Sequence, residues 1–142
     1  MTKIFFYHNT DDRIGTLATL IGKVYRQRKS ALIYAPEAEL ASQLDRRLWT
    51  HPPIGFVPHV RHTSLLAGET PIIITDDPTS MEHHERLFNL SPQVPPSFSR
   101  FVSVIEVVSS EDSERQSARE RVKFYKDRGY AIQYFDLAEK PQ

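Results

Sequence analysis

The order of apolar and polar stretches along the chain predicts an α/β protein. Short apolar runs of strand length alternate with longer segments in which apolar residues recur every three to four positions, the spacing of one helix face. Apolar strands that alternate with helices are typical of a mostly parallel sheet flanked by helices. The predicted strands are 3–8, 31–35, 71–75 and 101–108, with 86–90 as a further candidate and 130–135 closing the fold; the predicted helices are 13–28, 36–50 and 109–130.

Two segments between these elements have no regular period. Residues 49–68 carry three prolines, two glycines and three histidines, and 91–100 is rich in proline, so both are predicted to be ordered connections. A length of 142 residues suits one domain, 1–142, in which residues 137–142 are expected to fray.

Composition excludes several classes of protein. The formal net charge is zero, which gives no overall attraction to nucleic acid or anionic membrane. The absence of cysteine excludes disulfides, thiolate metal sites and cysteine nucleophiles. The apolar start of the chain is soon followed by Asp11 and Asp12, unlike a signal peptide, and no apolar run is long enough to span a membrane. A cytoplasmic location is therefore predicted.

The predicted helix 109–130 has an ordered distribution of charge. Ser109 and Ser110 stand where a capping serine would, and acidic residues follow at the end that the helix dipole favours. At about 100° per residue, four cations fall within roughly 80° of arc beside an apolar strip. The cations are Arg115, Arg119, Lys123 and Lys126, and the strip is Ala118, Val122 and Tyr125.

This pattern has two interpretations. A solvated basic face beside a core-facing stripe is common in globular proteins. A cationic ridge along an apolar strip also suits a peptide that has a hydrophobic end and carboxylates.

A parallel α/β sheet raises the possibility of nucleotide binding. Neither GxGxxG nor GxxxxGK[ST] occurs in the chain, and the first strand-to-helix loop carries two aspartates where phosphates need amides and cations. An α/β nucleotide-binding enzyme that uses Asp11, Asp12, Asp76 and Asp77 at strand ends is the alternative interpretation, although acids at such positions are commonly turn and cap residues.

The histidines and serines of the sequence form no recognisable catalytic motif. Five of the six histidines are candidate metal ligands (His51, His59, His62, His83 and His84); they lack HExxH spacing, and no GxSxG elbow is present. We therefore predict no catalytic residue, no metal and no cofactor.

Two blocks of sequence resemble one family. The first has Leu44, Asp45, Leu48, Trp49 and Pro52, followed by Phe56-Val57-Pro58-His59; the second has Val107-Val108, Glu111 to Ser113, Ala118 to Arg121, Tyr125 and Gly129-Tyr130. Together with the aromatic first strand, they are similar to the chi subunit of bacterial DNA polymerase III holoenzyme, over nearly the whole chain.

This resemblance implies a non-enzymatic adaptor of the clamp loader in DNA replication. One surface would bind the acidic C-terminal tail of single-stranded DNA-binding protein, which ends in Pro-Phe, and another would bind the psi subunit. The implied tail pocket is Val108, Arg115, Arg119, Val122, Tyr125 and Gly129. The family carries tyrosine where Val122 stands and lysine where Arg115 stands.

The implied psi surface is Trp49, Phe56, Val57, Pro58 and His59, which a repair helicase could share; the alternative for Trp49 is a core residue at a helix end. Direct binding of single-stranded DNA by the last helix is a third hypothesis, disfavoured by the neutral charge and by few aromatic platforms.

Overall fold

Among the residues that the structure describes, seven strands form one sheet in which every neighbouring pair is parallel. The computed structural model describes residues 2–27, 29–50, 60–61, 72–77 and 85–137. The strands are β1 (Lys3–Thr10), β2 (Ala31–Tyr34), β3 (Val60–Arg61), β4 (Ile72–Thr75), β5 (Arg86–Asn89), β6 (Ser103–Ser109) and β7 (Ile132–Asp136). The helices are α1 (Arg13–Arg26), α2 (Ala38–Thr50), α3 (Asp112–Asp127) and the short 3-10 helix η2 (Phe98–Arg100). The predicted α/β class with a parallel sheet is confirmed.

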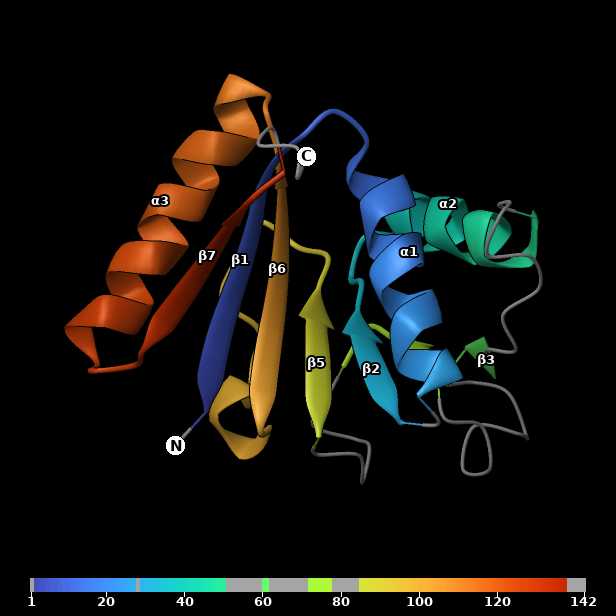
Figure 1. Cartoon of the computed structure of the whole chain (residues 1–142), viewed down its shortest axis with the longest axis horizontal. Helices are drawn as coiled ribbons and strands as arrows, with labels where there is room; N and C mark the ends of the chain where they lie inside the picture. The colour runs from blue at the N-terminus through green and yellow to red at the C-terminus, as the bar shows by residue number, and fades with distance from the viewer. Residues whose placement is uncertain (1, 28, 51–59, 62–71, 78–84, 138–142) are drawn as a thin grey trace.

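The strand order is β3-β4-β2-β5-β6-β1-β7, so the N-terminal strand lies between the last two strands of the chain. In Figure 1, α1 and α2 lie towards the β2 end of the sheet and α3 lies towards the β7 end. Two apolar clusters lie on opposite faces: one joins α1 and α2 to Ile33, Ile74 and Phe88, and the other joins α3 to Phe6 and Val104. β1 thus has side chains in both layers.

The β1–α1 turn is built around Asp12. Its carboxylate accepts a hydrogen bond from the backbone N–H of Gly15 at 3.0 Å, which caps α1. The same carboxylate pairs with Arg47 in the last turn of α2 at 2.9 Å, so the Asp12 side chain joins the start of α1 to the end of α2. A β-carbon on Gly15 would collide with Asp12 and Arg47, which explains glycine at this position.

Several predicted element ends differ from the observed ones by about two residues, and two of these differences, at the start of α3 and at the start of β6, involve specific local contacts. α3 begins at Asp112 with Glu111 as its N-cap residue, and Glu111 makes no capping bond through its side chain. Ser109 still belongs to β6; its N–H donates to Glu114 and its hydroxyl accepts from the N–H of Glu111, so it closes the turn before the helix. The predicted strand 101–108 starts two residues later, because Phe98–Arg100 forms a 3-10 turn that packs Phe98 into the core.

Within the described residues, no helix is both long and apolar enough to cross a membrane.

Candidate functional site

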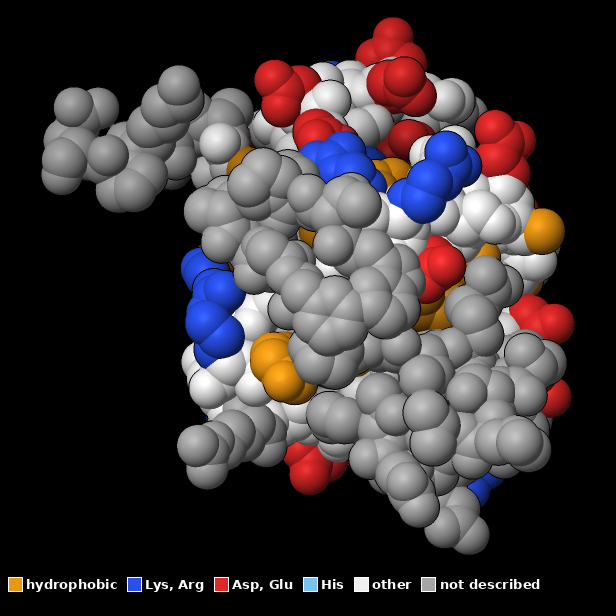
Figure 2. All heavy atoms as spheres, turned by 90° about the vertical axis from the view of Figure 1, so that its right-hand side faces the viewer, with side chains coloured by type: hydrophobic (Ala, Val, Ile, Leu, Met, Phe, Trp, Pro, Cys, Tyr) orange, Lys and Arg blue, Asp and Glu red, His pale blue; other side chains and the backbone are white. Residues whose placement is uncertain are grey.

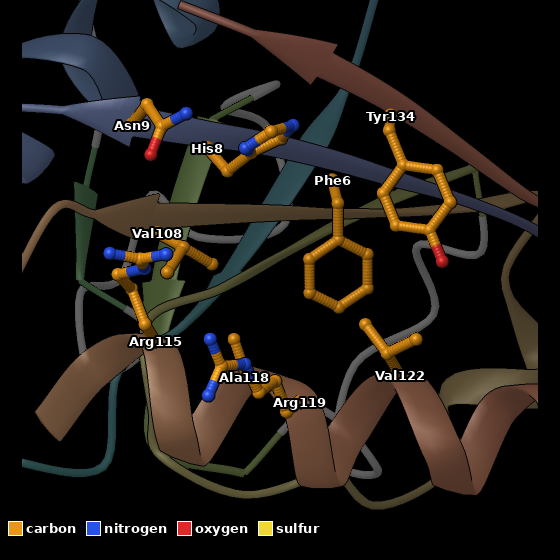
Figure 3. Close-up of a pocket in the computed structure, with 9 residues that line it drawn as sticks. All are labelled: Phe6, His8, Asn9, Val108, Arg115, Ala118, Arg119, Val122 and Tyr134. Atoms are coloured by element: carbon orange, nitrogen blue, oxygen red, sulfur yellow. The ribbon is translucent and has the colours of Figure 1, made fainter. Parts of the chain in front are cut away.

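A surface pocket of about 380 Å³ lies between α3 and the strands β1, β6 and β7. Its position follows from the strand order, because β7 pairs with β1 and brings the end of the chain beside the first strand. Figure 3 shows the nine residues that line it: Phe6, His8, Asn9, Val108, Arg115, Ala118, Arg119, Val122 and Tyr134.

One end of the pocket is apolar. Phe6 forms the floor and is almost fully buried, Val122 of α3 lies on one side, and Tyr134 of β7 lies on the other (Figure 3). The rings of Phe6 and Tyr134 have centroids 6.3 Å apart, and Tyr134 is 49% exposed, so part of this residue is accessible to a ligand. A pocket of this shape suits a single aromatic or aliphatic side chain.

The other end is cationic. Arg115 and Arg119 are four residues apart on α3, so they share one face of the helix, and both are exposed. Neither guanidinium has an ion-pair partner in the described part of the chain. Lys126 adds a positive charge at the apolar end, with its ammonium nitrogen 5.8 Å from the centre of the Tyr134 ring. Carboxylates that flank a hydrophobic side chain would find partners on both sides.

The structure brings together four of the six residues of the predicted tail pocket. Val108, Arg115, Arg119 and Val122 line the cavity. Tyr125 does not, because it is fully buried beneath the helix. Gly129 also does not: it lies after the end of α3 with a φ of +83° and reverses the chain towards β7.

A buried polar network holds α3 against the sheet. The fully buried Glu106 of β6 accepts hydrogen bonds from Arg121 Nε at 3.1 Å, Asn89 Nδ2 at 2.9 Å and Tyr125 hydroxyl at 2.9 Å. Arg121 also donates to the carbonyl of Pro92. Arg121 of α3 therefore points into the core, whereas Arg115 and Arg119 of the same helix are exposed at the pocket.

Burial controls the ionisation of this network. Burial raises the pKa of the Glu106 carboxyl, while the Arg121 guanidinium and the hydrogen bonds from Asn89 and Tyr125 act in the opposite direction. Burial also raises the pKa of the Tyr125 phenol, and the negative charge of Glu106 adds to the effect. Tyr125 is therefore neutral and serves as a hydrogen-bond donor to Glu106.

Sequence reasoning missed four lining residues: Phe6, His8, Asn9 and Tyr134. Ala118, which the helical wheel placed on the apolar strip but which is not in the implied tail pocket, also lines the cavity. The alternation along β1 was the available signal, since Phe6 and His8 share a face. The pairing of Tyr134 with Phe6 was not readable from sequence order.

The predicted psi surface falls mainly outside the described residues. Phe56, Val57, Pro58 and His59 are outside them, and for Trp49 the structure describes the backbone at the end of α2 alone. Figure 2 shows the face at this end of the sheet, where the described acidic and basic side chains are interspersed.

The four strand-end aspartates of the alternative interpretation do not meet. Asp11 and Asp12 follow β1, Asp76 and Asp77 follow β4, and three strands lie between β1 and β4. Asp12 caps α1, and the N–H of Asp77 donates to the Thr75 hydroxyl in a tight turn. No group of three or more potential metal ligands occurs among the residues the structure describes.

The fold and the pocket define a parallel α/β protein with a surface hollow between α3 and the strands β1, β6 and β7. Comparison with known proteins shows its family. Residues 1–133 match the family model described as "DNA polymerase III chi subunit, HolC". The chain belongs to this family of replication-associated DNA polymerase III subunits.

Three relatives carry the name DNA polymerase III subunit chi. The Pseudomonas aeruginosa protein is 30% identical over 139 residues, which cover 94% of this chain and 95% of the relative. The Haemophilus influenzae protein is 30% identical over 114 residues, covering 80% and 79%. The Escherichia coli protein is 32% identical over 109 residues, covering 76% and 74%.

Proposed function

We propose that this chain is a non-catalytic adaptor of the clamp loader that binds the acidic C-terminal tail of single-stranded DNA-binding protein in the α3 pocket. The observation that carries the proposal is the pairing of an aromatic-lined hollow with two exposed arginines in one cavity. The terminal Phe of the tail would enter between Phe6, Val122 and Tyr134. Its carboxylates would bind Arg115 and Arg119, whose planar guanidinium groups suit carboxylates.

Tyr134 supports the proposal because it supplies an aromatic side chain to a pocket in which α3 contributes Val122. Val122 replaces the aromatic wall that the family resemblance implies on α3. Tyr134 supplies an aromatic wall from β7 instead. Its ring packs beside that of Phe6 and lies edge-on to the His8 ring, with the His8 and Tyr134 ring centroids 6.4 Å apart. Arg115 keeps a positive charge where the family resemblance implies lysine.

The expected affinity is modest. A few tail residues bury far less surface than a standard protein interface, so we expect a Kd on the order of micromolar, or about −8 kcal/mol. Part of this free energy comes from exposed charges, which salt screens.

The test is a calorimetric titration of the full chain with a nine-residue peptide that copies the tail of the single-stranded DNA-binding protein from the same organism. We expect saturable binding that is lost with a peptide lacking the final Phe and weakened about tenfold or more in Arg119→Ala, since hydrogen bonds to charged groups contribute about 1.5–3 kcal/mol. Arg100→Ala, which removes an exposed arginine outside the pocket, is the matched control. Absence of binding by the unchanged protein would contradict the proposal.

We also propose that the chain links the tail to the psi subunit of the clamp loader through Trp49, Phe56, Val57, Pro58 and His59. The support is the sequence resemblance, together with the position of Trp49 at the end of α2, far along the sheet from β7. Co-purification of psi should fail with Phe56→Ala, while tail binding is unchanged. Loss of both activities would mean that the two surfaces are not separate.

A further inference from the structure

A groove runs along the opposite face of β1 and β7 from the tail pocket. It is formed by two adjoining cavities of about 250 and 650 Å³, which share Tyr7, Leu20 and Lys23 in their walls. One wall is a single face of α1, because its lining residues between Thr16 and Gln27 are three or four positions apart.

The floor of this groove is aromatic. The ring of Phe135 is stacked on the ring of Tyr7, with centroids 4.6 Å apart and planes 15° apart, and its centroid lies 6.3 Å from that of Phe5. Phe135 and the following Leu137 are each 38% exposed. Alternation along β1 and β7 places these residues on one face and Phe6 and Tyr134 on the other. The strands therefore present an apolar surface on each side.

Parallel sheets normally have both faces covered by helices. Here α1 and α2 pack over the strands at the β2 end of this face, and α3 packs on the opposite face (Figure 1). Within the described residues, α1 covers β1 only in part: Phe5 and Tyr7 pack against the α1–α2 cluster, whereas Phe135 does not belong to it. The groove extends along α1 from Thr16 to Gln27. At a rise of 1.5 Å per residue, this length is about 16 Å, or about three helical turns.

The charges of the groove differ between its two ends. Arg86, which pairs with Glu85 at 3.0 Å, lies at the starts of the strands, and Lys23, which has no ion-pair partner in the described part of the chain, lies in the wall that both cavities share. The exposed Lys3 lies on the same side of β1 as Phe5. The end at the finish of β1 carries Asp11.

We propose that this groove docks an amphipathic helix of a partner protein, about three turns long, that runs parallel to α1. Its apolar face covers Tyr7, Leu20 and Phe135. Its N-terminus, the positive end of its dipole, lies near Asp11, and acidic residues in its C-terminal half lie near Lys23.

The end of the chain itself fits the groove less well. The last residues of the chain, 138–142, contain alanine and proline as their apolar residues, too little to cover three aromatic rings.

The test uses two synthetic 16-residue peptides and the ¹⁵N-labelled full chain. Both peptides have leucines at helical spacing of three and four; one carries glutamates in its last two turns, and the other carries lysines at the same positions. We expect saturable shifts of the amide signals of Tyr7, Leu20 and Phe135 with the glutamate peptide at concentrations below about 1 mM. Lys23→Glu should reverse the preference between the two peptides.

Phe135→Ser should abolish these shifts, while Val102→Ser, at an exposed valine outside the groove, should leave them unchanged. The spread of the amide signals in the ¹⁵N spectrum reports that each variant remains folded. Equal affinity for the two peptides, or no saturable shift with either, would overturn the proposal. Shifts that depend on protein concentration without peptide would identify a second copy as the occupant and would also overturn it.

Discussion

Substitution of Glu106 by Gln tests the buried network beneath α3. The Glu106 carboxylate is fully buried and accepts hydrogen bonds from Arg121, Asn89 and Tyr125. Glutamine has nearly the same shape but no charge, and arginine does not lose its proton in proteins. The Arg121 side chain, which is 5% exposed, would therefore keep a buried charge without a counter-ion. Breaking a buried pair in this way costs about 3–5 kcal/mol.

For a chain of 142 residues, this free energy corresponds to a fall in Tm of roughly 10–17 °C, from an unfolding entropy of about 2.1 cal/mol/K per residue. Urea and thermal denaturation followed by circular dichroism would measure both quantities. The control is Glu85→Gln, which removes an exposed carboxylate paired with Arg86 and should change stability by less than about 0.5 kcal/mol.

The double variant Glu106→Gln/Arg121→Met separates the charge from the packing. It removes both charges and should recover much of the lost stability, because methionine fills a similar volume without needing a partner. A loss below about 1 kcal/mol in Glu106→Gln alone would refute the reasoning. Glu106 would then be protonated in the native protein, and the carbonyl of Pro92 and the hydroxyl of Ser117 would suffice for Arg121.

Three further predictions concern α3 and its pocket. The pKa of Tyr125 is raised in the folded protein, so its contribution to the free energy of unfolding is complete below pH about 10, the pKa of tyrosine in an unfolded chain, and is lost as the pH rises further. In urea titrations, the free energy of unfolding of Tyr125→Phe should therefore fall less steeply with pH above about 10 than that of the unchanged protein. Gly129→Ala should cost about 1 kcal/mol in the same titrations through backbone strain alone, since φ is +83° and nothing lies within 4 Å of the added carbon; an unchanged stability would contradict this. Tail-peptide affinity should fall between 50 and 500 mM NaCl, and a salt-independent Kd would exclude a role for Arg115 and Arg119 in binding charge.

Much of the fold could be predicted because each buried strand is a continuous apolar run bounded by turn residues. The strands of residues 31–35 and 71–75 were located within one residue at each end. The two-residue strand β3 was missed, since Val60-Arg61 sits in a segment without a period. The order of the strands was not predicted, because pairing between β1 and β6 depends on the packing of the whole sheet rather than on local sequence.

The site was partly predictable for a similar reason. The helical wheel placed Arg115 and Arg119 beside Val122, which is a property of one element. It could not show that Tyr125, on the same strip, points under the helix to Glu106 and not into the pocket. Nor could it show the contribution of β7, because Tyr134 reaches the pocket through a pairing with the first strand.

The position of β1 between β6 and β7 has a consequence for the biosynthesis of the protein. Lys3 is synthesised about 100 residues before its partner Ser103, and β7 comes later still. At about 5–20 residues per second, β1 waits roughly 5–20 s for its first neighbour. During that time its aromatic side chains have no sheet to join, and both surfaces described above are absent. Chaperones that hold an apolar N-terminal segment would therefore affect the yield of this protein more than its final stability.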